Sequence, residues 1–276
     1  MQQKYSLTRY GTCMNETFSD PSTSNLKNPA PFHAVVTGAS SGIGAATVRE
    51  LTKWGWKVTA VARRADRLAA LAQETGCQVV TADITNADDR ARLAQVVTKS
   101  GPLHALVNNA GGALGTDKVE TGDIDQWRAM YEVNVLGTLA VTQALLPALR
   151  AGGRGDIVLL TSTAAHDTYP GGGGYVAAKH AERTIANTLR LELVGEPIRV
   201  IEIAPGMVHT EEFSLNRMGG NQQAADAVYQ GVDHPLVASD IADAIVWTLT
   251  RPHHVNIDSM IIRPRAQASN TLVARK

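Results

Sequence analysis

The sequence has no excess of charge, no long apolar run and very little cysteine, and each absence excludes a class of protein. Lys and Arg total 26, as do Asp and Glu, so the net charge is zero. A nucleic-acid-binding protein usually carries a basic excess, so no nucleic-acid partner is expected. No run of about 18 apolar residues is present, so we expect no membrane-spanning helix and no membrane partner. The two cysteines, Cys13 and Cys77, are far apart, which argues against a disulfide framework or a zinc site and favours the cytoplasm.

The remaining composition is that of a globular domain, with 44% apolar and 19% charged residues over 276 positions. Residues 1–30 are polar and lack the apolar segment of a signal peptide, so we expect a polar arm, either flexible or docked on a partner. Residues 31–265 show no composition break and no internal repeat, which favours one domain. Residues 266–276 form a C-terminal tail.

Short apolar runs alternate with amphipathic segments along this domain. The runs are rich in Val, Ile and Leu and have no polar alternation, as in parallel strands covered on both faces. They lie at 32–37, 57–62, 78–82, 104–109, 156–162, 198–204 and 255–263. The pattern predicts an α/β fold, a single Rossmann-like doubly wound parallel sheet of about seven strands with helices on both faces.

The first strand ends in TGASSGIG, residues 37–44, which we call the glycine turn. Gly38, Gly42 and Gly44 depart from the G-x-G-x-x-G spacing. A glycine-rich turn from a strand into a helix nevertheless brings backbone N–H groups close to a pyrophosphate at a helix N-terminus. A second glycine run precedes Tyr175, but it fails the P-loop pattern because Ala178 and His180 replace the required Gly and Ser or Thr.

The second strand ends in Arg63 and Arg64. An NAD site typically has an acidic residue there, which binds the ribose 2′-hydroxyl. Guanidinium groups instead suit a 2′-phosphate, which predicts NADP(H) as the cofactor. The alternative is that both arginines only solvate the start of the next helix.

With the glycine turn, NNAG at 108–111 and Y-x-x-x-K at 175–179, the chain resembles the short-chain dehydrogenase/reductase family over residues 32 to about 268. The resemblance implies a catalytic set of Asn134, Ser162, Tyr175 and Lys179 and no metal. Together with the turn and the arginines, it places the cofactor against Gly38, Ser40, Ser41, Gly42, Ile43, Gly44, Arg63, Arg64, Asp83, Ile84, Asn109, Ala110, Gly111, Tyr175, Lys179, Pro205, Gly206, Val208 and Thr210.

The residue types fit the reduction of a carbonyl by a hydride. A free tyrosine has a pKa near 10, and a cation one helical turn away lowers it toward the range useful for acid–base catalysis. Ser162 would stabilise charge on the substrate oxygen. The resemblance implies that Asn134 supports a water linking Lys179 to solvent. A lone Y-x-x-x-K is commonly a surface pair, so the argument depends on the joint set.

Longer stretches narrow the resemblance to NADP-dependent 3-hydroxy acid (serine and allo-threonine) dehydrogenases and a clavulanate-aldehyde reductase. These are NNAGGALG, TEEFSLNRMGGNQQAADAVYQG and PHHVNIDSMIIRPRAQ. They imply a small carbonyl or hydroxy substrate. Arg217 is either a partner for a substrate carboxylate or a solvated loop residue. The glycine-rich 163–174 segment is unusual and is expected to be an adaptable rim of the substrate pocket.

The resemblance also implies a homotetramer, with helices 130–149 and 175–193 at one interface and the tail reaching a neighbouring subunit. An alternative function is a catalytically silent, NADP(H)-sensing regulator with the same fold. The complete catalytic set argues against it, because a sensor does not need an acid–base pair.

Overall fold

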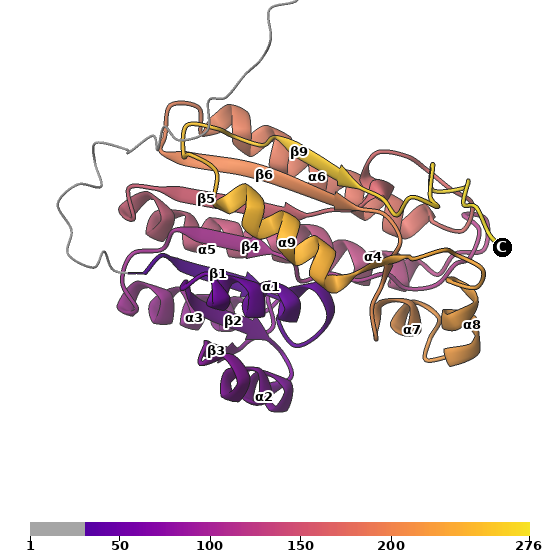
Figure 1. The fold of residues 1–276 in the computed structure, drawn as a ribbon, viewed down its shortest axis with the longest axis horizontal. Coiled ribbons are helices and arrows are strands. Elements are labelled where there is room, and N and C mark those ends of the chain that lie inside the picture. The colour runs from indigo at the N-terminus through magenta and orange to yellow at the C-terminus, as the bar shows by residue number, and fades with distance from the viewer. Residues whose placement is uncertain (1–30) are drawn as a thin grey trace, which may run out of the picture. The chain divides into compact units, whose positions relative to one another are not determined.

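The computed structural model describes residues 31–276, so the predicted arm at 1–30 lies outside the described residues. A seven-stranded parallel sheet runs through the domain in the order β3-β2-β1-β4-β5-β6-β9 (Figure 1). Its strands are β1 His33–Thr37, β2 Lys57–Ala62, β3 Gln78–Thr81, β4 Ala105–Asn108, β5 Gly155–Leu160, β6 Ile198–Pro205 and β9 Ser259–Ile262. The fold predicted from the apolar runs is confirmed.

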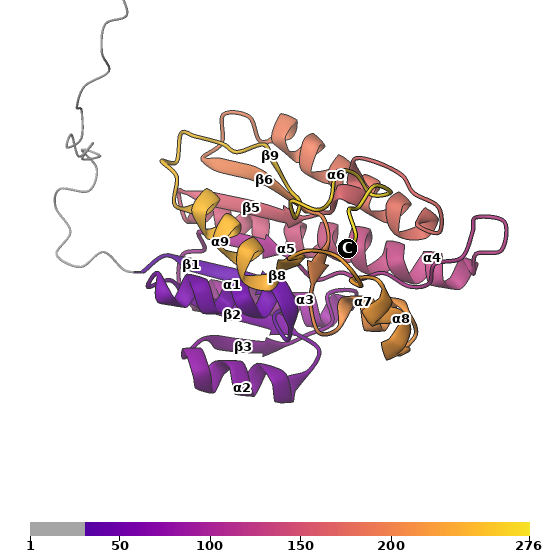
Figure 2. The same ribbon diagram turned by 45° about the vertical axis from the view of Figure 1, so that its right-hand side comes forward.

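Helices cover both faces of the sheet (Figures 1 and 2). One face carries α1 (Gly42–Lys53), α2 (Ala65–Thr75) and α9 (Ala238–Leu249), and the other carries α3 (Ala87–Lys99), α5 (Thr138–Ala151) and α6 (Gly173–Glu192). A separate cluster of buried apolar residues lies on each face, which explains why the strand sequences show no polar alternation.

The strand order reverses between β1 and β4, which pair with each other while their successors lie on opposite sides. Ligands of open α/β sheets bind at the carboxyl ends of the strands at such a switch point. The glycine turn follows β1 and the NNAG segment begins at the end of β4, so both expected cofactor segments lie at this point.

A continuous helical run contains α4 (Ile124–Tyr131), a π-helical turn η2 (Glu132–Gly137) and α5. The run is 28 residues long and has a mean hydropathy of 1.3 in an 18-residue window, enough by these two measures to cross a membrane. However, Val141, Leu145 and Leu149 of α5 are fully buried in the core. Core helices of soluble proteins pass the same test, so the run is weak evidence for a membrane span.

The segment after β6 forms structure that the sequence pattern did not indicate. β7 (Val208–His209) and β8 (Leu236–Val237) make a second, two-stranded parallel sheet. Between them lie two short helices, α7 (Phe213–Arg217) and α8 (Gln222–Ala227). This segment extends beyond the carboxyl edge of the main sheet (Figure 2).

The C-terminal tail folds back on its own chain. Val232 and Arg275 form an isolated antiparallel bridge, as do Gln267 and Val273. The Met207 backbone N–H donates to Gln267 Oε1 (2.8 Å), so the tail holds the segment that follows β6. The reach of the tail to a neighbouring subunit stays a prediction.

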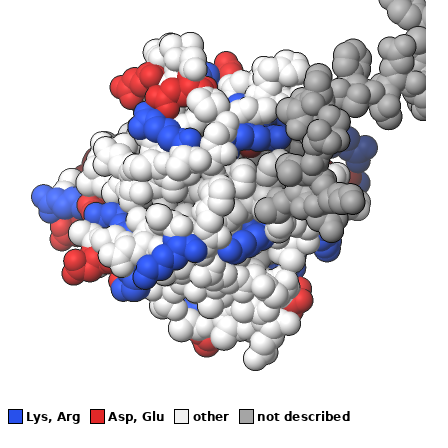
Figure 3. Space-filling view, turned by 90° about the vertical axis from the view of Figure 1, so that its left-hand side faces the viewer, with Lys and Arg blue, Asp and Glu red and all other residues white. Residues whose placement is uncertain are grey.

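Charged side chains on the face shown in Figure 3 are mixed in sign. Lys and Arg lie beside Asp and Glu among uncharged residues, without a continuous basic stripe on that face.

Candidate active site

The predicted catalytic residues Asn134 and Lys179 lie against Gly111 at the carboxyl edge of the sheet, and Tyr175 lies close to Lys179. Tyr175 and Lys179 lie one turn apart near the start of α6, and Asn134 lies in η2. The Lys179 Nζ atom is 5.8 Å from the centroid of the Tyr175 ring. A Cβ atom added to Gly111 would be 2.5 Å from Asn134 Oδ1 and 3.5 Å from Lys179 Nζ. The structure therefore brings these residues together, as the sequence predicted.

The side chain of Asn134 is fully used within the protein. Its Nδ2 donates to the carbonyl oxygens of Gly112 (2.9 Å) and Met130 (2.7 Å), and its Oδ1 accepts from Gly112 N–H (3.1 Å). The π-turn frees the Met130 carbonyl for this contact; such turns are frequent at functional sites. Asn134 therefore clamps the strand-end segment that runs beside Lys179.

Tyr175 lies in an environment that opposes its ionisation. Burial raises the pKa of its hydroxyl, and the positive charge of Lys179 and the hydroxyl of Ser162 lower it. Lys179 acts in the direction that the sequence predicted, but burial outweighs it, so the net direction is upward. The hydroxyl is thus held as a proton donor.

Ser162 follows β5 directly. Its Oγ accepts from the Ala164 backbone N–H (3.1 Å) and donates to the Pro205 carbonyl oxygen (3.4 Å). It caps the short 3₁₀ turn η3 (Thr163–Ala165), which fixes the hydroxyl on the side of Tyr175.

The glycine turn is packed against the end of β4. Gly38 has φ +66°, a conformation that favours glycine, and a Cβ there would be 2.6 Å from Asn109 Nδ2. Asn109 Nδ2 donates to the carbonyl oxygens of Thr37 (2.8 Å) and Gly38 (3.2 Å). Asn109 therefore supports the turn, whose backbone leads into the N-terminus of α1.

Arg64 is held by residues from the glycine turn and from the segment after β7. It donates to Ser40 Oγ and Ser41 Oγ and forms a two-pronged pair with the Glu212 carboxylate (2.6 and 2.8 Å). This contact raises the pKa of Arg64 and lowers that of Glu212. Arg63 is exposed, and its charge acts on Asp83. Glu212 therefore binds one of the two arginines that were predicted to bind the 2′-phosphate. This contact was not predicted from the sequence.

The other predicted cofactor positions line the same edge. The Asp83 carboxylate accepts from the backbone and hydroxyl of Thr85 (2.9 and 2.7 Å), and Ile84 lies against Gly137. Thr210 faces the glycine turn, because its methyl group would be 3.5 Å from a Cβ at Gly42. The remaining positions lie in the first turn of α1 (Ile43 and Gly44), just after β4 (Ala110), at and after the end of β6 (Pro205 and Gly206) and in β7 (Val208).

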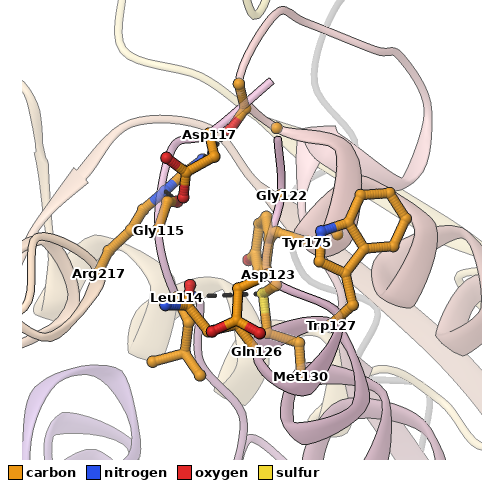
Figure 4. A pocket seen from close by; sticks show the side chains of 13 residues that line it. Leu114, Gly115, Asp117, Gly122, Asp123, Gln126, Trp127, Met130, Tyr175 and Arg217 are labelled. Atoms are coloured by element: carbon orange, nitrogen blue, oxygen red, sulfur yellow. Dashed lines mark hydrogen bonds between the residues drawn. The ribbon is translucent and has the colours of Figure 1, made fainter. Parts of the chain in front are cut away.

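A narrow cleft, with about 10 Å³ of space for water-sized molecules, lies beside Tyr175 (Figure 4). Arg217 of α7 extends to one side of it and Trp127 of α4 lies on the other. Arg217 donates to the carbonyl oxygens of Gly115 (3.2 Å) and Gly171 (3.3 Å) and to Tyr169 Oη (3.1 Å). Its guanidinium carbon is 5.8 Å from the Tyr175 ring centroid. Arg217 is therefore a residue of the cleft and not only a solvated loop residue.

The glycine run before Tyr175 is packed tightly, and α6 begins within it at Gly173. A Cβ at Gly174 would be 2.5 Å from Met130 Cε and 3.0 Å from the Trp127 indole. Gly171 and Gly172 also line the cleft. The glycines therefore allow large side chains of α4 to approach α6, whereas the sequence suggested only an adaptable rim.

Several residues of the site escaped the sequence analysis. Trp127, Met130 and Tyr169 carry no motif, and their place in the cleft comes from packing. Glu182 Oε2 accepts a hydrogen bond from Lys179 Nζ (2.6 Å). Its signal was the spacing K-x-x-E, which puts the two residues on one helix face. Among the described residues, no group of three or more His, Cys, Asp and Glu side chains could hold a metal ion.

A parallel sheet with a glycine-rich turn at its switch point and a buried Tyr–Lys pair beside it is the arrangement of a dinucleotide-dependent oxidoreductase. The family model for short chain dehydrogenases matches residues 32–218. The chain belongs to the short-chain dehydrogenase family.

Individual relatives agree with this assignment. An uncharacterised oxidoreductase of Mycobacterium tuberculosis is 55% identical over 86% of this chain and 92% of its own length. Serine 3-dehydrogenase of Agrobacterium fabrum is 43% identical over 85% of this chain and 94% of its own length. Among solved structures, the closed form of a serine dehydrogenase complexed with NADP⁺ superimposes with a TM-score of 0.81 at 34% identity, covering 89% of this chain and 100% of that one.

Proposed function

We propose that the protein is an NADP(H)-dependent oxidoreductase that interconverts a small 3-hydroxy acid and its carbonyl form, with Tyr175 as the acid and base. The observation that carries this proposal is the buried Tyr175–Lys179 pair at the edge of a cleft that contains Arg217. The similarity of the chain to a serine 3-dehydrogenase and to a serine dehydrogenase complexed with NADP⁺ supports the proposed substrate class and cofactor.

The residues at the switch point fit this cofactor. The glycine turn would present backbone N–H groups and a helix N-terminus to a pyrophosphate, and the lack of a side chain at Gly38 lets the turn pack against Asn109 and Ala110. Arg64 and Ser41 donate to the Glu212 carboxylate, and Arg64 also donates to Ser40; a 2′-phosphate would replace that carboxylate as their acceptor, with Arg63 nearby. Lys179 would also hold the nicotinamide ribose hydroxyls.

Bound NADPH supplies the hydride for the carbonyl carbon of the substrate. Tyr175 then gives its hydroxyl proton to the substrate oxygen, and the reverse reaction returns a proton to the tyrosinate. Ser162 Oγ hydrogen-bonds that oxygen and stabilises its developing negative charge. The positive charge of Lys179 favours tyrosinate formation. Asn134 fixes the backbone beside Lys179, where it supports the water that links Lys179 to solvent.

Arg217 supplies the specificity for an acid. The Arg217 side chain donates to three neutral acceptors, which are two backbone carbonyl oxygens and a tyrosine hydroxyl. A guanidinium carries five N–H donors, so hydrogens remain for a carboxylate in the cleft. The Arg217 guanidinium carbon lies 5.8 Å from the centroid of the Tyr175 ring, so a carboxylate bound to Arg217 would lie near Tyr175.

A panel of candidate substrates tests the function. Consumption of NADPH or NADP⁺ is followed by absorbance with L-serine, allo-threonine, 3-hydroxyisobutyrate, diketones and aldehydes, and in parallel with NADH or NAD⁺. We expect turnover with the phosphorylated cofactor, and a higher kcat/KM for serine than for its uncharged analogue serinol. Equal turnover of serine and serinol would contradict the role of Arg217. Tight NADPH binding without turnover of any compound would indicate the silent, NADP(H)-sensing regulator instead.

Cytoplasmic location and a homotetramer are part of the same proposal. Both follow from the resemblance to family members. Light scattering of the purified protein tests the second, with a mass of about four times 29.4 kDa as the expected result.

A further inference from the structure

Glu182 is a buried acid that the proposed reaction leaves unexplained. It lies three residues after Lys179 on α6, and its side chain is 1% exposed. Lys179 Nζ donates to Glu182 Oε2 at 2.6 Å and to the Leu160 carbonyl oxygen at 2.9 Å. The Lys179 side chain is 5% exposed, so the pair is shielded from solvent. A charge pair so deeply buried interacts far more strongly than one at the surface.

One oxygen of this carboxylate has no protein partner. Glu182 Oε1 is buried and forms no hydrogen bond with any described residue. Buried polar atoms are nearly always paired in native structures, because an unpaired one costs free energy. A pair selected for stability alone would satisfy both oxygens. The arrangement points to a role in the chemistry of the neighbouring residues.

We propose that Glu182 is a positioning residue of the acid–base pair, which holds the Lys179 ammonium group and offsets the field that this cation exerts on the Tyr175 hydroxyl. The inference rests on the proposed roles of Tyr175 and Lys179. It concerns a residue outside the set of Asn134, Ser162, Tyr175 and Lys179.

The physical reason is the competition of charges around one phenol. Lys179 favours the tyrosinate, and a carboxylate bonded to Lys179 cancels part of that effect. The Glu182 charge accordingly raises the pKa of Tyr175, in the same direction as burial. Glu182 thereby keeps Tyr175 in its protonated, proton-donating form over a wider pH range.

The state of Glu182 itself depends on its surroundings. Burial raises the pKa of Glu182 to about 7, while Lys179 lowers it and the nearby Glu202 of β6 raises it. Glu202 Oε1 accepts a hydrogen bond from Thr161 Oγ1 (2.7 Å) and is hydrogen-bonded to His166 Nε2 (3.0 Å). Arg183 Nε lies 3.8 Å from Glu202 Oε2. Protonation of Glu182 near neutral pH would remove its negative charge, so that Lys179 would lower the pKa of Tyr175 without opposition from Glu182.

The test is the pH dependence of catalysis in Glu182→Gln, which keeps a hydrogen-bond acceptor for Lys179 but removes the charge. The profile of kcat/KM is measured from about pH 6 to pH 10, where a tyrosine titrates. L-Serine with NADP⁺ is the probe, or the compound of the panel that turns over fastest. The matched control is Glu202→Gln, which removes another buried carboxylate that does not contact Lys179.

A second readout is independent of turnover. The near-ultraviolet absorbance of tyrosinate is titrated for each protein and for its Tyr175→Phe version, and the difference reports the Tyr175 hydroxyl alone. Glu182→Asp keeps the charge and should restore most of the parent behaviour. Glu182→Met removes the charge with a side chain of similar size and replaces Glu182→Gln if that variant fails to fold.

We expect Glu182→Gln to move the limb of the profile that reports Tyr175 ionisation to lower pH by about one unit, in both the rate and the absorbance titration. Glu202→Gln should move it by much less. An unmoved limb overturns the proposal, as does an equal shift in both variants. A shift to higher pH also overturns it, since Glu182 would then serve mainly to keep Lys179 charged. In each case a loss of activity in Tyr175→Phe would leave the proposed function intact.

Discussion

Two ion pairs are buried at opposite ends of the same strands, and they are built differently. At the amino ends of β5 and β6, Arg199 forms two hydrogen bonds with Asp156 (2.6 and 2.9 Å). Its remaining donors reach the carbonyl oxygens of Leu249, Arg251 and Val255. Near the carboxyl end of β5, Lys179 and Glu182 form one short hydrogen bond, and Glu182 Oε1 has no hydrogen-bond partner among the described residues.

The difference separates a structural pair from a functional one. Arg199 ties the start of two strands to the segment after α9 with its donors satisfied, which suits a fixed cross-link. The Lys179–Glu182 pair lies beside the residues that exchange a proton, and its incomplete bonding leaves the charge balance adjustable. We therefore expect mutations of the first pair to change stability, and mutations of the second to change pH dependence.

Asp156→Asn should give the largest effect, which is on stability. It would leave the Arg199 guanidinium buried without a counter-charge, and breaking a buried pair typically costs about 3–5 kcal/mol. Chemical denaturation measures the loss, with the exposed Asp243→Asn as the control. The folded fraction should keep its parent pH profile. A stability equal to that of the parent would remove the contrast between the two pairs.

The half-exposed Arg64–Glu212 pair should give an intermediate effect, on cofactor affinity. Arg63→Ala combined with Arg64→Ala removes two donors for the 2′-phosphate, so the Kd for NADP⁺ should rise about 30- to 100-fold while that for NAD⁺ changes little. Fluorescence titration measures both. Arg67→Ala is the control, because this exposed residue lies in the first turn of α2, which directly follows Arg63 and Arg64. Equal losses for the two cofactors would refute the phosphate site.

The smallest effect should be a change in how stability depends on pH. The pKa of Glu182 is raised from its usual 4.5 to about 7 in the folded protein. The folded state therefore binds this proton more tightly than the unfolded state, and the contribution of Glu182 to stability falls as pH rises from about 4.5 to about 7.

Glu182→Gln removes this dependence. The free energy of unfolding of the variant minus that of the parent should rise by about 1–2 kcal/mol as the pH is raised from about 5 to about 7. Denaturation at a series of pH values measures the gain. An equal gain in Glu202→Gln would contradict the prediction, because it would show that the gain is not specific to Glu182, the partner of Lys179.

The sheet was predictable because its physics is local. The inner strands are buried on both faces and are mostly apolar, so they were found from their sequence, as was the glycine turn. The edge strands β3 and β9 are partly exposed, but they contain short apolar runs that indicated them as well. β7 and β8 are two residues each and show no periodicity. Their pairing depends on the segment between them, which sequence alone did not place.

The candidate site was predictable where one motif holds several residues. Tyr175 and Lys179 share one helix turn, so their proximity followed from spacing. Glu182 has the spacing of an ordinary surface pair, and only the packing of α6 on the sheet buries it. Arg64 and Glu212 are 148 residues apart, so no local pattern could indicate their contact.

The most direct test of the account is to measure Tyr175→Phe for binding and turnover in the same preparation. The phenylalanine keeps the ring packed against Phe213 but removes the exchangeable proton. We predict that turnover of the fastest substrate falls at least about 1,000-fold, within the range for loss of a general acid, while the Kd for NADPH stays within about twofold. Turnover above about a tenth of the parent rate, with NADPH still bound, would contradict the assignment of Tyr175 as the acid and base.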